Sequence, residues 1–410
     1  MSRTPLLIFS LIFPPIIDTF YSKKFGRRKT WSVPSMLING ILLIYFSKKI
    51  ENLIENAEFL AITSWFFVFQ FFTTIREMTC DGWTLTLLSR ENVGMIGICC
   101  STGYTIGDFL GFTFPMILRD WGIGFEEFLL VVGVVYVIVS LLAGIFEGES
   151  DASTETESSP ADHAADQITF TQTLKIAFHL LKQQKFLIYA ITILSSTFAL
   201  FTITTSFEIK LVKIGYPSSE IASINVVATI VKLILPWVFQ PLLTNGRPLT
   251  FYLWFSIFGL VVSGLALVDV YLLSDRLTDG EGDNTSYPLT LQILTKTLLI
   301  SSTSIETMFY TITSSFSGKV ADPIVGASSM TVYLTVINIY IFVAKPIFMY
   351  LVEEFGFYEV GIFNLVMGVV CYFLIKGKVV EIDGLEGEEW YYKGSEGGDR
   401  DLEKEKVAII

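Results

Sequence analysis

The chain has few of the residues on which most catalytic centres are built. It contains two histidines in 410 residues, and charged residues make up 17% of it. Both histidines, His163 and His179, fall in a polar stretch and the helix that follows, which supports neither a histidine-based nucleophile relay nor a membrane acyltransferase centre. The sequence shows no P-loop pattern, metal-ligand cluster or nucleic-acid-binding patch. It therefore predicts neither an enzyme nor an ATP-driven pump, and it implies no cofactor.

Cysteine is also scarce, with four residues in the chain. All four lie in or beside apolar segments, which argues against a disulfide framework and favours small packing residues or free thiols. They are Cys80, Cys99, Cys100 and Cys371.

Apolar residues are abundant instead. Hydrophobic residues make up 52% of the chain and aromatic residues 14%, and the mean hydropathy is +0.58. This composition predicts an all-α polytopic membrane protein rather than soluble domains. The net charge of −12 arises mainly from two segments, because residues 147–166 hold seven acids and residues 381–405 hold ten. We expect both to be solvated and disordered.

Eleven apolar segments approach the roughly 20 residues that a helical crossing needs. They lie at residues 3–21, 31–47, 58–79, 93–117, 126–146, 186–207, 220–243, 250–274, 289–316, 325–350 and 357–377. The resulting division is an N-terminal bundle (1–146), an acidic cytosolic linker with a surface helix (147–185), a C-terminal bundle (186–378) and an acidic cytosolic tail (379–410).

The cations predict the orientation of these segments. Five lie between Lys23 and Lys29, which marks this loop as cytosolic by the positive-inside rule. The predicted inner segments then carry 13 Lys and Arg, and the outer ones carry 6. This orientation places Met1 on the outer side.

The most informative stretch runs from Arg76 to Asn92 and reads R-E-M-T-C-D-G-W-T-L-T-L-L-S-R-E-N. It places Arg76, Glu77 and Asp81 at or inside the inner end of a predicted membrane helix, where ionisable groups are costly and mark functional sites. The alternative is a polar helix end at which Arg76 extends toward the surface and pairs with Glu77.

The run D-G-W-x-L-T-x-L-S-R-E-N-V-G resembles the signature of the acetyl-coenzyme A transporter family, a branch of the major facilitator superfamily. Asp18 followed by F-G-R-R-K is similar to that superfamily's loop between its second and third helices, where an acid and an Arg-rich corner clamp neighbouring helix ends. Residues 316–331, F-S-G-K-V-A-D-P-I-V-G-A-S-S-M-T, are similar to a third family stretch. The chain departs from the family at Arg76-Glu77, where a Gln-Asp pair is typical, and after residue 337, where a glycine-rich continuation is replaced.

The resemblance implies a facilitator fold of twelve helices, of which eleven are visible and the first is apparently missing, so we expect a further apolar helix upstream. It also implies a carrier that imports acetyl-coenzyme A from the cytosol into the endoplasmic reticulum lumen. Two alternative functions remain. The protein is a carrier of another anionic solute, or it is a membrane scaffold without transport activity.

Phosphates need cations, and the predicted solute contacts follow from this requirement. The predicted substrate-binding residues are Arg76, Asp81, Arg90 and Lys232, with Asp81 orienting the helix end by pairing with a cation or capping backbone amides. The predicted inner-mouth residues are Asp18, Arg27, Arg28, Glu91 and Asn92.

Segment 93–117 contains Gly103, Gly107 and Gly111, four residues apart. Such a stripe favours close approach of another helix, either at the interface between the two halves or as generic packing. Asp108 in the same segment is a candidate proton or substrate site, or a partner of Arg76.

Further charges interrupt the apolar segments of the second half. Four such charges occur, and each is expected either to face a central cavity or to lie near a membrane face. Cations that face the cavity would suit an anionic solute. The four residues are Lys232, Lys296, Glu306 and Lys345. Lys296 and Glu306 are ten residues apart, about 15 Å along a helix, and are not expected to pair with each other.

Two surface features complete the predictions. Residues 169–182 read as a capped amphipathic helix on the inner membrane surface, with Phe170, Leu174, Phe178 and Leu181 on its apolar face. Asn284-Thr-Ser is a glycosylation acceptor pattern in a predicted outer loop.

Overall fold

The computed structural model describes residues 13–22, 25–120, 122–146, 169–201, 206–278, 288–322, 325–385 and 387–391. Within these ranges every regular element is helical. Seven helices are long and apolar enough to cross a membrane, which confirms an all-α multi-pass membrane protein. They span Lys29–Ser47, Phe59–Leu85, Glu91–Gly111, Phe125–Ile145, Glu220–Val238, Pro248–Asp275 and Phe357–Asp383. Asn284 and most of the acidic linker lie outside the described residues.

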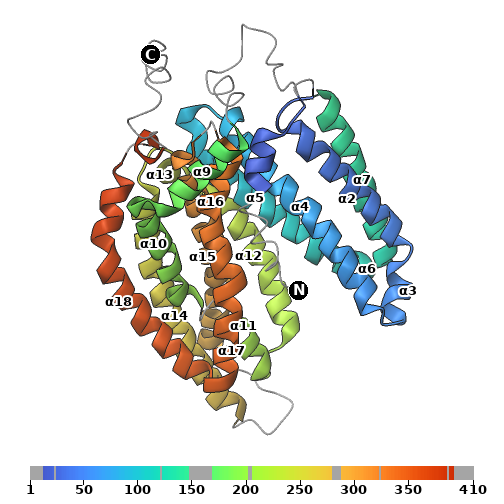
Figure 1. The fold of residues 1–410 in the computed structure, drawn as a ribbon. Helices are drawn as coiled ribbons and strands as arrows, with labels where there is room; N and C mark the ends of the chain where they lie inside the picture. Colours follow the sequence, from blue (N-terminus) through green and yellow to red (C-terminus); the bar gives the residue numbers. More distant parts are fainter. Residues whose placement is uncertain are drawn as a thin grey trace.

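The N-terminal helices occupy one side of the molecule, at the right of Figure 1. Residues 13–19 are helical and precede α2 (Lys29–Ser47), α3 (Ile50–Glu55), α4 (Phe59–Leu87), η1 (Arg90–Met95), α5 (Ile96–Asp108), η2 (Phe109–Thr113), α6 (Phe114–Asp120) and α7 (Phe125–Phe146). Helices α2 and α7 cross where Gly40 and Gly133 face each other. A Cβ on either glycine would lie 3.0 Å from the other's carbonyl oxygen, so this crossing requires glycine on both helices.

The C-terminal helices form the larger group, at the left of Figure 1. They are α9 (Phe170–Lys182), α10 (Gln184–Phe201), α11 (Phe207–Lys213), α12 (Ser218–Val238), α13 (Gln240–Thr244), α14 (Pro248–Thr278), α15 (Leu289–Val320), α16 (Gly326–Ile339), η5 (Tyr340–Ala344), α17 (Lys345–Phe355), α18 (Phe357–Asp383) and η6 (Gly387–Trp390). Most of the buried apolar side chains belong to this group, with α15 at its centre.

Three further predicted spans are helical in the structure. Segment 186–207 begins as α10, segment 289–316 lies within α15, and segment 325–350 becomes α16, η5 and α17. Helix α15 is rich in serine and threonine, and Thr311, Thr313 and Ser317 each donate a hydrogen bond to the carbonyl four residues earlier. These bonds help a polar helix to be buried, because these three hydroxyls need no partner outside the helix. The count of eleven spans stays a prediction.

One long helix in each group is interrupted by a five-residue π-helical segment. Helix α5 passes through η2 into α6, and α16 passes through η5 into α17. Pro115 and Pro346 each lie six residues after the start of the π segment before them. A π segment frees backbone groups and often marks a functional bend. Each group therefore contains a long helix with a π segment that is followed closely by a proline.

Helix α9 forms as predicted, including the capping box of Thr169 and Gln172. Its covered side differs from the predicted apolar face, because Thr173, Ala177 and Leu180 are the residues buried against the protein. Phe178 remains exposed.

The described beginning of the predicted acidic tail (379–410) is folded, and the rest of the tail stays a prediction. Helix α18 continues to Asp383, and η6 then folds back onto the inner ends of α10, α15 and α16. Trp390 is 0% exposed and packs against Phe316 and Tyr333, with ring centroids 5.5 and 6.1 Å away. Lys185 donates to the Glu389 carbonyl at 3.0 Å. A single tryptophan thus anchors a stretch whose composition predicts disorder.

Candidate solute site

The inner ends of the two groups meet at Asp18. Its carboxylate accepts hydrogen bonds from Arg28 Nη1 at 2.8 Å and Arg27 Nη2 at 3.1 Å. It also accepts from the Ser328 hydroxyl at 2.6 Å and from the Ser328 amide at 2.8 Å, at the start of α16. One buried acid therefore pairs with two arginines of the first group and caps a helix of the second. The structure brings Asp18, Arg27 and Arg28 together, as the resemblance predicts.

Gly82, the glycine of the D-G-W run, packs against the same arginine. A Cβ on Gly82 would lie 2.8 Å from Arg28 Nη1 and 2.8 Å from the Ala327 amide nitrogen. A Cβ on Gly326 would lie 3.1 Å from Arg28 Nη2. The three stretches that carry the family resemblance therefore converge on one guanidinium, which is 1% exposed. We call the contact of Asp18, Arg28, Gly82, Gly326 and Ser328 the inner closure.

A second contact joins α5 to the other group beside the inner closure. A Cβ on Gly97 would collide with the Thr311 carbonyl and with Ser315 on α15. A Cβ on Gly94 would lie 2.8 Å from the Leu243 carbonyl. Trp237 Nε1 on α12 donates to the Thr102 hydroxyl at 3.2 Å. The two groups are thus packed tightly at their inner ends.

The predicted glycine stripe on α5 does not make this contact. No heavy atom of the described residues lies within 4 Å of a Cβ built on Gly103, Gly107 or Gly111. Among the described residues no neighbouring helix meets these glycines, and their packing role stays a prediction. The stripe that packs is Gly97, Ser101 and Thr105, which is also spaced by four residues and is buried.

The α4 charges lie just outward of the inner closure. Arg76, Glu77 and Asp81 lie within electrostatic range of one another, and Tyr104 of α5 and Tyr310 of α15 lie within range of Asp81. The rings of Tyr104 and Tyr310 meet edge to face at 5.2 Å and link the two groups. We call Arg76, Glu77, Asp81, Tyr104 and Tyr310 the central cluster.

Asp81 does not take the predicted helix-end role. Helix α4 continues to Leu87, so Asp81 lies six residues before its end. Among the described residues, its carboxylate has no hydrogen-bond or ion-pair partner. The buried Nε of Arg76 likewise makes no hydrogen bond there. The central cluster thus offers an unused guanidinium donor beside a partnerless acid.

The second-half charges pair across helices rather than along them. Lys296 of α15 lies 3.2 Å from Glu220 of α12, and Lys345 of α17 lies 3.5 Å from Glu306 of α15. The expectation that Lys296 and Glu306 do not pair is confirmed. Glu220 is a partner that sequence reasoning missed, because helix pairing brings it close.

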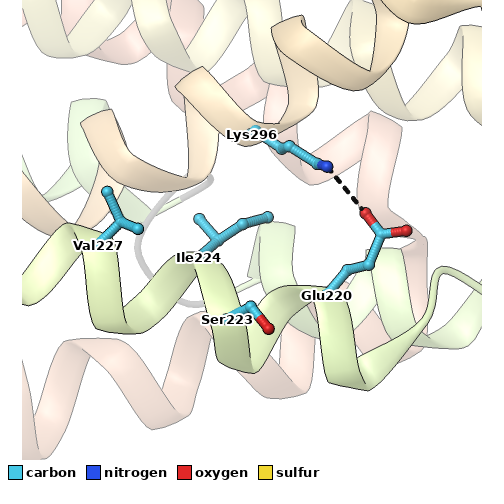
Figure 2. A pocket seen from close by; sticks show the side chains of 5 residues that line it. All are labelled: Glu220, Ser223, Ile224, Val227 and Lys296. Atoms are coloured by element: carbon cyan, nitrogen blue, oxygen red, sulfur yellow. Dashed lines mark ion pairs between the residues drawn. The ribbon is translucent and has the colours of Figure 1, made fainter.

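Figure 2 shows Lys296 reaching toward Glu220 beside a cavity of about 300 Å³. Ser223, Ile224 and Val227 of α12 complete its lining. The cavity lies beside the first turns of α12 and α15, at the end of these helices that the sequence predicts to be outer.

The remaining predicted residues are separated from these clusters or only partly described. Lys232 is half-buried on α12 and has no partner among the described residues. Asp108 is exposed at the end of α5, and its role as a proton or substrate site, or as a partner of Arg76, stays a prediction. Glu91 and Asn92 are exposed on η1, where Asn92 donates to the Ser89 hydroxyl at 3.0 Å. Arg90 begins η1, but its side chain lies outside the described part.

Membrane-spanning helices that carry charges in their interiors and meet at one inner closure define a multi-pass membrane protein of the transporter class. A family model described as acetyl-coenzyme A transporter 1 matches residues 3–240, which is more than half of the chain. The chain belongs to this family.

Two curated relatives match shorter regions. An uncharacterized protein of Schizosaccharomyces pombe is 32% identical over 112 residues, covering 27% of this chain and 22% of the relative. An uncharacterized membrane protein of Saccharomyces cerevisiae is 28% identical over 145 residues, covering 29% of this chain and 26% of the relative. The chain thus spans about a quarter of the length of these relatives.

Proposed function

We propose that this protein carries acetyl-coenzyme A across the endoplasmic reticulum membrane, from the cytosol to the lumen. The observation that carries the proposal is the family match over residues 3–240, which includes both the Arg-rich corner and the D-G-W run. The mechanism is alternating access of two helical groups, in the manner of the major facilitator superfamily. The structure then corresponds to a state in which the inner side is closed.

The charges suit a phosphate-bearing solute. In the closed arrangement Arg28 is covered and held by Asp18, so it is not free to bind solute. Opening the inner side would separate Arg28 from α16 and expose it, together with Arg27, at the cytosolic mouth, where Arg90 of η1 also lies. Arg76 is the next cation inward along the path, and its unused Nε is a donor for phosphate. Lys232 is the second predicted interior cation.

Uptake into liposomes tests the proposal. Purified protein should take up labelled acetyl-coenzyme A, and unlabelled acetyl-coenzyme A should compete. Arg76→Ala should reduce uptake, whereas Arg119→Ala, at the exposed outer end of α6, should leave it unchanged. Folded, inserted protein that takes up no acetyl-coenzyme A but takes up another organic anion would identify a different solute. Uptake of no anion at all would indicate a scaffold without transport activity.

The location is tested separately by imaging the tagged protein in its own cells. Co-localisation with a lumenal endoplasmic reticulum marker is expected, and localisation to another membrane would refute this part of the proposal.

A further inference from the structure

The cavity between α12 and α15 contains an ion pair that water can reach. Lys296 lies 3.2 Å from Glu220, and their side chains are 42% and 46% exposed. Figure 2 shows the two side chains meeting across the space between the helices. The volume of about 300 Å³ is at the lower end of the range for small-molecule sites. The lining thus combines an accessible cation and an accessible anion with the aliphatic side chains of Ile224 and Val227.

The two members of this pair differ in what else holds them. Glu220 also accepts a hydrogen bond from the Tyr216 hydroxyl at 3.1 Å, and Tyr216 is 3% exposed. Lys296 has no hydrogen-bond or ion-pair partner other than Glu220 among the described residues. If the pair separates, Glu220 keeps a donor, whereas Lys296 is left with an unpaired positive charge. The cavity is therefore suited to an anion that replaces Glu220 on Lys296.

A partly accessible face of α15 leads inward from this cavity. Half-buried residues recur along it at spacings of three and four, which place them on one side of the helix. They are Lys296, Ile300, Thr303, Thr307 and Tyr310. The ring of Tyr310 meets that of Tyr104 of the first group at 5.2 Å, so this side of α15 faces the first group. Residues 311–318 are all buried, and the accessible face ends there.

The composition of this face indicates contact with water rather than with lipid. It carries a lysine, two threonines and a tyrosine, and a lysine facing acyl chains would be costly. Lys296 and Tyr310 are 14 residues apart, which is about 21 Å along the helix. Lys296 therefore lies on the outer half of a water-accessible face between the two groups, well outward of the central cluster.

We propose that Lys296 binds a phosphate group of the solute on the outer half of the transport path, and that Glu220 takes the place of this phosphate while the cavity is empty. The inference rests on the proposed function for the identity of the solute. Binding exchanges a carboxylate for a phosphate on the same ammonium group. The ammonium group is thus paired whether or not solute is bound, and Glu220 stays hydrogen-bonded to Tyr216. Competition by Glu220 weakens solute binding at this position, which favours release to the outer side.

Two isosteric substitutions with opposite expected effects test this competition. The measurement is the KM for labelled acetyl-coenzyme A presented at the outer face of oriented proteoliposomes that contain unlabelled solute. Glu220→Gln removes the competitor and should lower this KM by about 1.5- to 5-fold, the fold-change that corresponds to the strength of an exposed ion pair. Lys296→Gln should raise the KM by about tenfold, because a hydrogen bond to a charged group is lost. Lys296→Arg should retain most of the affinity.

Lys185→Gln is the matched control, because Lys185 forms a similarly exposed pair with Glu389 at the inner end of the second group. It should leave the KM at the outer face unchanged. An ion pair with a structural role alone would be broken equally by Glu220→Gln and Lys296→Gln. A change of KM in the same direction for these two variants, or no change in either, would overturn the proposal.

Thermal unfolding of the solubilised protein tests the anion site independently of acetyl-coenzyme A. Adenosine diphosphate and inorganic pyrophosphate are the probes, and each should raise the unfolding temperature of the wild type with increasing concentration. Glu220→Gln should need less of each probe for the same rise, and Lys296→Gln should need about tenfold more. If acetyl-coenzyme A is not transported but this pattern is found, the anion site stands and the solute assignment fails.

Three outcomes of the unfolding experiment count against the proposal. Equal stabilisation of the wild type and Lys296→Gln at every probe concentration would refute the anion site. An effect of pyrophosphate without an effect of adenosine diphosphate would show that the cavity takes an inorganic anion rather than the phosphate of an organic solute. Stabilisation that depends on Lys296 but is produced by phosphatidylglycerol alone would assign the site to a lipid headgroup.

Discussion

Gly82→Ala should open the inner closure. A methyl group at this position would lie 2.8 Å from the Ala327 amide nitrogen and 2.8 Å from Arg28 Nη1. Arg28 is buried and bound to Asp18, and the amide belongs to the backbone of α16, so neither can move without loosening the contact. Overpacking of this kind costs about 1–3 kcal/mol. Under the proposed alternating access the cost falls on the closed state alone, because opening of the inner side would separate these residues.

A penalty of about 1–3 kcal/mol on one of two states shifts their equilibrium by about 5–150-fold. Met330 is a suitable reporter, because it lies in the first turns of α16 and is 0% exposed. In a background without other cysteines, Met330→Cys should react with a membrane-impermeant maleimide from the cytosolic side faster, by a factor in that range, when Gly82 is alanine.

Gly103→Ala is the matched control, because no atom of a described residue lies within 4 Å of its built Cβ. It should leave the labelling rate unchanged. Equal labelling rates in the Gly82→Ala and Gly103→Ala proteins, with equal thermal stability, would show that the glycine does not hold the two groups together.

Three further changes probe the other contacts. Asp18→Ala should destabilise the folded protein by about 3–5 kcal/mol, because it leaves buried Arg28 without its acid, and an unchanged thermal unfolding temperature would contradict this. Trp390→Ala should lower the free energy of unfolding by about 3–5 kcal/mol, and Trp390→Phe should lower it less, because the tryptophan fills the inner end of the second group. If truncation before η6 leaves the stability unchanged, this stretch is not needed for folding. Arg90→Lys keeps the charge but loses the planar guanidinium, so it should weaken acetyl-coenzyme A uptake while the protein remains inserted. Arg76→Ala should weaken uptake further. Normal uptake by both variants would indicate that the solute binds in the second half.

The contact at Asp18 could be predicted in part from the sequence. The spacing of Asp18 to the Arg-rich corner, read through the family resemblance, predicts an acid that binds these arginines, and the structure places them together. The third partner, Ser328, lies 310 residues from Asp18. No local sequence pattern predicts that a side chain caps a helix so far away in the chain. The contact of Asp18 with Ser328 could therefore be found only in the folded structure.

The two stripes on α5 show where spacing alone fails. Gly103, Gly107 and Gly111 have the same spacing as Gly97, Ser101 and Thr105, and the glycines predict closer packing. Within the part of the chain that the structure describes, contacts are made at Gly97 and not at the three glycines, because a small residue leaves space whether or not a neighbour fills it. Which face of α5 meets α15 is decided by the crossing of the two helices, which depends on residues in both.

Trp390 and Glu220 were missed for related reasons. Acidic composition around Trp390 predicts a solvated tail, but one large aromatic side chain offers enough buried area to hold a short turn in place. Glu220 stands at the start of α12 and reads as an ordinary first-turn acid, and only the packing of α12 on α15 brings it to Lys296. Both contacts depend on helix positions that no local pattern contains.

Arg28 packs against both Gly82 and Gly326, and this limits the substitutions that the protein can accept at these positions. The space beside Gly82 and the space beside Gly326 are filled by the same guanidinium, so the volumes at positions 28, 82 and 326 are shared rather than independent. Alanine at Gly82 should become tolerable only if the side chain at position 28 is shortened in the same protein. Arg28→Lys, harmful alone because it loses a fork that fits Asp18, should then partly rescue Gly82→Ala. Sequence change at positions 28, 82 and 326 should accordingly occur as paired, compensating substitutions rather than as single replacements.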